Sequence, residues 1–347
     1  MRCIRPALVV LAIFTCMALV SPVHAQFKKD AGDVKGSQLG ESRTQCWKVG
    51  MEITAATPCT GIVGYVPVPV DWPEQQVKEV KEDISPQAKI SYQKIDKDMK
   101  LMVVKIPKLP AGQTAHAFVT YEVKRSSQLP PETTDQYVLP DNRKLRGPIR
   151  LYLAPSPYIE SRSPKILKLA REIGAAKPKT GKIKDEKEGE KSEEGEAEEE
   201  KELTPWQQVE TVYDWVQEHV EYKKGKLKGA LAALKDGTGD CEELSSLFIA
   251  ICRAKGIPAR TVWVPGHCYA EFYLEDAEGE GHWFPCQPAG SRAFGGIPEF
   301  RPVLQKGDSF RLPDDRKTVV RYLPERLKVS GTQSRPTVKF IRETVAQ

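Results

Sequence analysis

A glycine-rich turn that runs directly into an amphipathic helix, at residues 237–260, constrains the fold of this chain more than any other stretch. Leucine, isoleucine and phenylalanine recur there at helical spacing, so we expect one face of the helix to be buried. Asp240 and Glu243 have the spacing of a capping box, which predicts that the helix begins at Cys241. Gly256 predicts where this helix ends, because glycine commonly follows the last helical turn. The chain is therefore expected to place one cysteine at the start of a buried helix.

Cys241 has two interpretations at this point. A thiol in the first turn of a helix lies at the positive end of the macrodipole, which lowers the pKa of the thiol toward the reactive thiolate. Free cysteine is also among the most buried residue types, so a small core residue is the alternative. The stretch by itself favours neither.

Residues 1–25 have the pattern of an export signal. Two arginines precede an apolar run at residues 7–20, and small residues precede Gln26 as they do at a cleavage site. The apolar run is too short to cross a bilayer as a helix. We therefore expect a mature chain without a membrane span, in the periplasm or outside the cell.

The composition limits the partners. A chain of 347 residues with 40% hydrophobic content is long enough for two domains with apolar cores. Its formal net charge of +5 is small for this length, and no stripe of Lys and Arg with interleaved aromatic residues occurs. This pattern argues against nucleic acid as a partner. The sequence does not indicate an oligomeric state.

Residues 40–155 are expected to form an antiparallel β-sandwich, because short alternating apolar runs are separated there by Pro and Gly. The predicted strands are 46–55, 61–70, 89–94, 101–106 and 115–124. Cys46 and Cys59 flank the turn between the first two strands. In an oxidising compartment this placement predicts a disulfide, with two buried thiols as the alternative.

The rest of the chain divides into four segments. Residues 156–176 predict a connecting helix. Residues 177–203 are nearly all Lys, Glu, Gly and Ser, which predicts a disordered, solvated insertion or a tail that binds cations or a partner. Residues 204–300 predict an α+β domain, and residues 301–347 a C-terminal extension of short strands. The strands expected in the α+β domain are 260–265, 267–275 and 283–287.

A nucleophilic cysteine needs a base within hydrogen-bond reach. His267 and His282 both lie in the hairpin that follows the Cys241 helix. The other three histidines lie in the export signal, on a polar strand face and off the apolar stripe of a helix. If the hairpin is symmetrical about Ala277, His267 lies opposite Gln287. We therefore prefer His267 to His282 as the base, with Gln287 accepting the imidazole N–H and fixing its tautomer.

Strand alternation sorts this hairpin into two faces. The face of His267 also carries Tyr269 and Trp283, and its polar and aromatic character predicts a cleft. The opposite face is apolar and predicts core. It carries Cys268 and Cys286, which the same register makes direct neighbours. This predicts a second disulfide.

Four motifs resemble those of the transglutaminase-like superfamily of papain-type thiol enzymes, over about residues 206–290. They are Gly-Asp-Cys with Leu-Phe six residues after the Cys, Arg-x-x-Gly-Ile-Pro-Ala-Arg, a His-x-x-x-Glu strand and a Trp-x-Pro strand. The resemblance implies a transglutaminase-like, papain-type core domain after the sandwich. Carried over by motif position, Cys241 is the nucleophile and His267 is the base.

The resemblance also implies an activity, namely cleavage or transfer of acyl groups at protein or peptide amide bonds through a cysteine thioester, without a cofactor. Tyr269 stands where the family usually has Trp. Gln287 stands where the family has Asp, so it can orient the imidazole but cannot stabilise imidazolium by charge. The alternative is therefore a catalytically degenerate domain that acts as a protein-binding or scaffold module.

The sequence offers two further candidate sites. Tyr222 is a candidate donor to the oxyanion beside the Cys241 backbone N–H, and a packed aromatic residue is its alternative. A zinc site of Cys241, Cys252, His267 and Cys268 is disfavoured. No Cys-x-x-Cys spacing supports it, and adjacent strand residues point to opposite faces. No metal is therefore expected.

Overall fold

The computed structural model describes residues 36–95, 99–174 and 202–346. These residues all fall within one compact unit of the chain. The export signal predicted at residues 1–25 and nearly all of the insertion predicted at 177–203 lie outside them.

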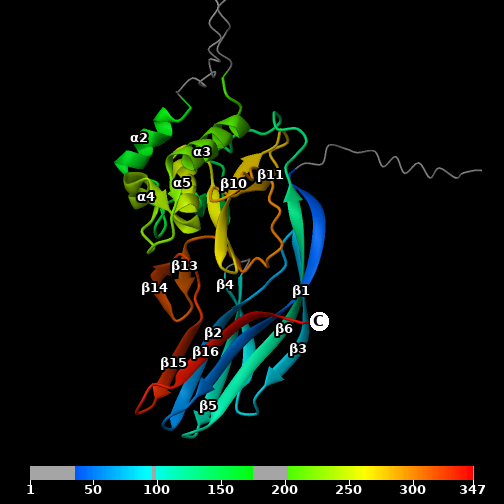
Figure 1. Cartoon of the computed structure of the whole chain (residues 1–347), viewed down its shortest axis with the longest axis vertical. Helices are drawn as coiled ribbons and strands as arrows, with labels where there is room; N and C mark the ends of the chain where they lie inside the picture. The colour runs from blue at the N-terminus through cyan, green and yellow to red at the C-terminus, as the bar shows by residue number, and fades with distance from the viewer. Residues whose placement is uncertain (1–35, 96–98, 175–201, 347) are drawn as a thin grey trace, which may run out of the picture. The chain divides into compact units, whose positions relative to one another are not determined.

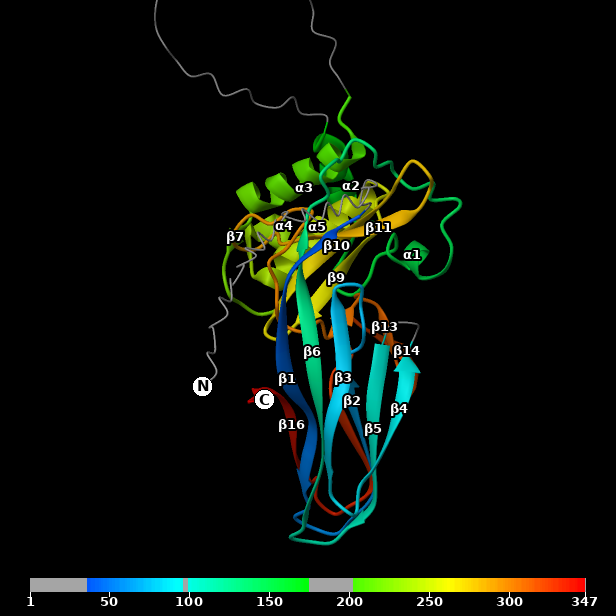
Figure 2. The ribbon, with the colours of Figure 1, turned by 90° about the vertical axis from the view of Figure 1, so that its right-hand side faces the viewer.

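Two four-stranded antiparallel sheets form the predicted β-sandwich, with strand orders β16-β1-β6-β3 and β15-β2-β5-β4 (Figure 2). The strands are β1 (Gln38–Thr54), β2 (Cys59–Val68), β3 (Gln75–Ile84), β4 (Lys89–Ile95), β5 (Met99–Leu109), β6 (Thr114–Leu129), β15 (Arg326–Gly331) and β16 (Thr337–Val345). The alternating residues of β6 from Ala115 to Val123 face the core and are almost fully buried. Alternation therefore predicted this strand correctly.

Three features of the sandwich differ from the sequence prediction. Strand β3 was missed, because its polar sequence at the edge of a sheet has few apolar positions. The first six sandwich strands end at Leu129 rather than near residue 155, and Tyr137 already packs in the core of the helix-containing α+β part. Residues 301–347 are not a separate extension, because β15 and β16 pair with β2 and β1 and complete the two sheets.

The α+β part places helices against an antiparallel sheet of order β11-β10-β9-β12 (Figure 1). Its elements are α2 (Pro164–Glu172), α3 (Pro205–His219), α4 (Ala230–Asp236), α5 (Cys241–Ala254), β9 (Ala259–Val264), β10 (His267–Glu275), β11 (Gly281–Cys286) and β12 (Gln305–Lys306). Short elements complete the fold: α1 (Gly147–Leu151), β7 (Glu221–Tyr222), β8 (Thr238–Gly239), β13 (Phe310–Leu312) and β14 (Asp315–Val320).

Helix α5 lies at the centre of this part, since every residue from Glu243 to Arg253 is buried. It packs against α2, α3 and α4 on one side and against β9 and β10 on the other. Helix α2 was predicted as a connecting helix at residues 156–176. It is shorter than predicted, and its buried Ile166 belongs to the same core as α5. Of the helices in the described ranges, none is long and apolar enough to cross a membrane.

Buried ion pairs connect β10 and β12 to the sandwich. Lys306 Nζ lies 2.6 Å from Glu271 Oε1 and 2.8 Å from Glu74 Oε1. Arg260 Nη2 lies 2.7 Å from Glu271 Oε2, and Arg125 Nη1 lies 3.5 Å from Glu74 Oε1. All five side chains are at most 9% exposed. The sandwich and the α+β part therefore share a cluster of charged groups that is almost fully buried.

Candidate active site

The capping box predicted for α5 is present, and it presents Cys241 as the first helical residue. The Asp240 side chain accepts a hydrogen bond from Glu242 N at 2.8 Å, and Glu243 Oε2 accepts one from Asp240 N at 3.1 Å. Glu243 Oε1 also accepts from Lys228 N at 2.9 Å. The buried Glu243 carboxylate thus ties the start of α5 to the loop before α4.

Gly237 and Gly239 lie in the turn before Cys241, and each position requires glycine for a different steric reason. Gly237 ends α4 in the left-handed conformation, with φ of 65°, which favours glycine. At Gly239 a Cβ atom would lie 2.4 Å from Glu243 Cβ, so a side chain there would displace the capping residue. Close packing therefore requires this glycine.

His267 begins β10 after a tight turn from β9. Its Nε2 lies 3.0 Å from Gln287 Oε1, directly beyond the end of β11. Because an amide oxygen only accepts, Nε2 carries the proton and Nδ1 is the ring nitrogen left for a thiol. The backbone of Gln287 is held at both ends, by Ala293 O at 2.8 Å and by the Tyr213 hydroxyl at 2.9 Å.

The thiol of Cys241 is strongly acidic in this setting. Hydrogen bonds from the Cys268 side chain and then from His267 outweigh burial and lower the pKa of Cys241 to about 4. Burial alone would lower the pKa of His267, but its hydrogen bond to Cys241 and the thiolate charge raise it. Both shifts favour a thiolate beside an imidazolium, the reactive form of papain-type enzymes.

The pair lies in an open cleft of about 520 Å³. One wall, which includes Tyr222 and Asp240, belongs to the domain predicted at residues 204–300. The other comes from the C-terminal part of the chain, with Arg321, Tyr322 and Arg342. No local pattern could indicate these three residues, because they follow Cys241 by 80 residues or more and only the fold brings them near it.

Tyr222 lines the cleft and is half exposed. Desolvation and then the charge of Cys241 raise the pKa of its phenol, so the hydroxyl stays protonated. It is therefore available as a hydrogen-bond donor near the sulfur.

Tyr269 and Trp283 do not line this cleft, so the prediction of a cleft along the whole strand face was wrong. Tyr269 is fully buried, and its hydroxyl accepts a hydrogen bond from Arg125 of the sandwich at 3.0 Å. The Arg260 guanidinium lies over the Trp283 ring, with its Cζ atom 4.0 Å from the centroid of that ring. Arg125 of the sandwich therefore covers Tyr269, whereas Trp283 is covered by Arg260 and Tyr152.

The hairpin register differs by two positions from the expected one. Ala270, not Cys268, pairs with Cys286. The reason lies in the turn, where the Asp276 carboxylate accepts from Glu278 N and Glu280 N and centres the turn at Glu278. A register shift of two residues leaves each side chain on the same face of the hairpin. The side chain of Gln287 therefore still reaches His267.

Neither predicted disulfide is present, and all six cysteines within the described ranges are free thiols. The register separates Cys268 from Cys286. Cys46 lies in the middle of β1, eight residues before the end of that strand, whereas Cys59 begins β2 in the other sheet. A strand rises about 3.3 Å per residue, so the two cysteines lie too far apart for a bond.

The other candidate residues of the sequence analysis, His282 and Cys252, lie outside the cleft. His282 is hydrogen-bonded to Asp276 Oδ2 at 3.1 Å in the hairpin turn, away from Cys241. Cys252 is fully buried in the apolar core, where burial raises the pKa of its thiol. The four ligands weighed for zinc do not come together among the described residues.

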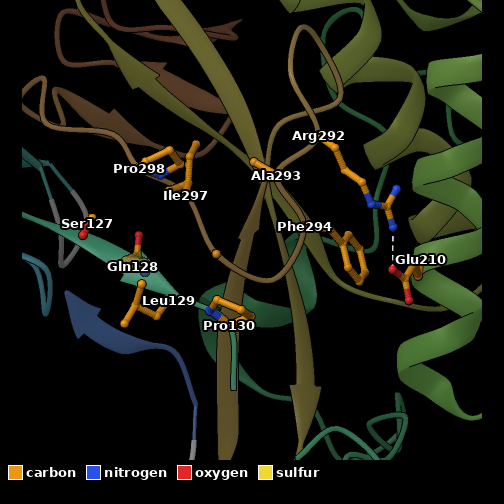
Figure 3. Close-up of a pocket in the computed structure, with 11 residues that line it drawn as sticks. Ser127, Gln128, Leu129, Pro130, Glu210, Arg292, Ala293, Phe294, Ile297 and Pro298 are labelled. Carbon is orange, nitrogen blue, oxygen red and sulfur yellow. Dashed lines mark hydrogen bonds and ion pairs between the residues drawn. The ribbon is translucent and has the colours of Figure 1, made fainter. Parts of the chain in front are cut away.

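A second hollow, of about 410 Å³, lies between the end of β6 and the loop after Gln287 (Figure 3). Its lining includes Leu129, Pro130 and Phe294, and Arg292 pairs across one end with Glu210 of α3. Cys241 and His267 are not part of it. The cleft at the start of α5 is therefore the candidate active site.

Comparisons with known proteins agree with this geometry. Residues 194–288 match the family model of the transglutaminase-like superfamily. A solved chain from Cytophaga hutchinsonii, described as a "putative cysteine protease", is similar over 88% of this chain and 93% of its own, with a TM-score of 0.51 and 19% identity. At this identity the similarity shows the fold.

A "putative protease" from Parabacteroides distasonis is aligned over 74% of this chain and 48% of its own, with 10% identity and a TM-score of 0.26, which is too low to indicate a shared fold. The sequence matches no curated protein.

Proposed function

Because this chain carries a domain of the transglutaminase-like superfamily, we propose that it is a cysteine-dependent enzyme that cleaves or transfers acyl groups at protein or peptide amide bonds. One observation carries the proposal. Cys241 and His267 line one open cleft, Gln287 is hydrogen-bonded to His267, and the Cys241 thiol is held as thiolate. A structural cysteine needs neither a lowered pKa nor access to a cleft.

The proposed reaction has two halves. The Cys241 thiolate attacks the amide carbonyl, and the protonated His267 gives its proton to the leaving nitrogen as the C–N bond breaks. Neutral His267 then takes a proton from water or from an amine, which attacks the thioester and releases Cys241. Water completes hydrolysis and an amine completes transfer.

The oxyanion formed in each half needs hydrogen-bond donors. The N–H of Cys241 lies in the first turn of α5, where backbone N–H groups have no partner within the helix. We assign the second donor to Tyr222, since its protonated hydroxyl lies in the same cleft.

The experiment offers wild-type protein a proteome-derived peptide library together with a fluorescent primary amine. New peptide amino termini report hydrolysis, and fluorescent peptides report transfer. We expect one of the two signals, and we expect C241S to lose it. Equal signals from the wild type and C241S would contradict the proposal.

Because Gln287 is neutral and cannot stabilise an imidazolium by charge, a second function is a binding or scaffold module that uses the same cleft. This function predicts that C241S still retains peptides from the library on a column, and that the wild type releases them unchanged. Release of cleaved or amine-labelled peptides by the wild type alone excludes it.

Export to the periplasm or to the outside of the cell is part of the proposal and is supported by the pattern of residues 1–25. Amino-terminal sequencing of the mature protein should begin near Gln26. A mature chain that retains the apolar run would contradict export by cleavage.

A further inference from the structure

Tyr213 of α3 is hydrogen-bonded to the main chain on both sides of the loop that follows β11. Its hydroxyl donates to Gln287 O at 2.9 Å and accepts from Ala293 N at 2.9 Å. Gln287 N also donates to Ala293 O at 2.8 Å, so these two residues close the base of the loop. The hydroxyl therefore bonds directly to the residue whose side chain contacts His267.

The surroundings of Tyr213 keep its hydroxyl in place and protonated. The residue is fully buried, and its ring packs against Phe248 of α5 and Phe294 of the loop, with ring centroids 6.4 Å and 5.3 Å apart. Burial raises the pKa of the phenol to about 12, although the hydrogen bond from Ala293 N acts against this shift. The hydroxyl can therefore donate to Gln287 O throughout the neutral pH range.

The other contacts of this loop do not bond to the main chain of Gln287. Arg292 pairs with Glu210 of α3 at 2.5 Å, between two side chains that are well exposed (Figure 3). Exposed ion pairs contribute little to stability. Gly290 lies close to the Gln287 side chain, since a Cβ atom there would be 3.4 Å from Gln287 Nε2. Tyr213 is thus the buried side chain that connects α3 to Gln287.

We propose that Tyr213 is a positioning residue, whose hydroxyl fixes the main chain of Gln287 and thereby holds the Gln287 amide oxygen against His267 Nε2. This inference rests on the proposed function, because it describes how the base of that reaction is oriented. The Gln287 oxygen lies 3.0 Å from His267 Nε2, and an acceptor at this distance stabilises the protonated ring. A loosened main chain would weaken that contact.

The test compares the wild type with Y213F, which removes the hydroxyl and keeps the ring. Y137F is the matched control. Tyr137 is fully buried in the same core, but its hydroxyl accepts from Gly36 N at 3.0 Å instead of contacting the loop after β11. For each protein, NMR gives the midpoint of the His267 titration, and steady-state kinetics with the best peptide of the library gives kcat and KM. The NMR measurement needs no turnover.

We expect Y213F to lower kcat about threefold to tenfold, the size of one lost hydrogen bond between neutral groups, and to leave KM nearly unchanged. It should also lower the midpoint of the His267 titration, because the protonated ring loses part of its acceptor. Y137F should leave both quantities close to those of the wild type. Equal values for Y213F and Y137F would overturn the inference, and so would a fall in kcat without a shift of the midpoint.

A second comparison places Y213F in the Q287A background. The double variant should be almost as active as Q287A alone, because the side chain that Tyr213 positions is already absent. A loss in kcat equal to that in the wild-type background would overturn the inference. If Y213F melts below the assay temperature, all proteins are compared at a lower temperature in sucrose, which favours the compact state.

The outcomes separate the inference from the proposed function. Turnover of peptides by the wild type, with an unchanged His267 midpoint in Y213F, overturns the inference alone. No turnover by the wild type, combined with the expected shift of the midpoint, overturns the proposed function alone. No turnover with an unchanged midpoint contradicts both.

Discussion

Gln287 is the residue on which the chemistry of this site depends most. A carboxylate at this position would both orient the imidazole and stabilise its positive charge, whereas the amide only accepts its N–H. In this chain Cys241 itself supplies the negative charge that raises the pKa of His267. The ion pair is therefore maintained by the nucleophile, and Gln287 fixes the tautomer and the ring orientation.

Replacing Gln287 by Ala should lower kcat/KM by about 10- to 100-fold, since a hydrogen bond to a charged group contributes about 1.5–3 kcal/mol. Gln287 raises the pKa of His267, so Q287A should move the alkaline limb of the pH–rate profile to lower pH. Q287E keeps the acceptor and adds a charge, so it should move that limb to higher pH. Steady-state kinetics with the best peptide of the library measures both, and identical profiles would contradict this role.

At the scale of elements, α5 and the β10–β11 hairpin show which local structure the sequence determines. The bounds of α5 were predicted because its capping box, apolar stripe and terminal glycine all lie within the helix and its flanks. The faces of the hairpin were predicted for the same reason, since alternation is local. Its register was not predicted, because a side chain in the turn, Asp276, sets the centre of the turn.

Glu243 links the start of α5 to its surroundings, and its loss should weaken the fold. E243A leaves the N–H groups of Asp240 and Lys228 without their acceptor, which should lower the free energy of unfolding by about 1–3 kcal/mol. E243Q keeps an acceptor oxygen and should recover part of the loss. Urea denaturation of these variants, with the exposed E218A as control, measures the effect. A loss equal to that of the control would contradict it.

At the scale of the whole molecule, the C-terminal residues join the two parts. After the α+β part the chain supplies Arg321 and Tyr322 to the cleft and then adds β15 and β16 to the sandwich. Pairs such as Cys46 with Val345 bring residues from opposite ends of the chain together. Hydrophobic pattern cannot reveal such pairing, so the sequence predicts these strands only as a C-terminal extension.

The buried ion cluster should make the two parts depend on each other. K306M removes the partner that Glu74 and Glu271 share, and breaking a buried ion pair costs about 3–5 kcal/mol. Chemical denaturation should show this loss, whereas K105M, on an exposed strand position, should show almost none. A loss of similar size in both variants would show that the cluster does not stabilise the molecule.

The same cluster predicts a dependence on acid. Burial alone would raise the pKa of Glu271, but Lys306 and Arg260 outweigh it and lower this pKa to about 2. The folded pKa lies below the unfolded value of about 4.3. The stabilisation is therefore present above about pH 4 and is lost as pH falls toward 2. K306M raises the folded pKa, so its acid unfolding should occur at higher pH than that of the wild type.

The pH dependence of Cys241 alkylation in the wild type tests the central claim, an activated nucleophile in an open cleft, most directly. With a thiolate formed near pH 4, the rate of reaction with iodoacetamide at Cys241 should stay nearly constant between pH 6 and pH 8. A free thiol, with a pKa of about 8.5, instead reacts roughly tenfold faster with each pH unit in the lower part of this range. A rate that rises in that way would contradict the account.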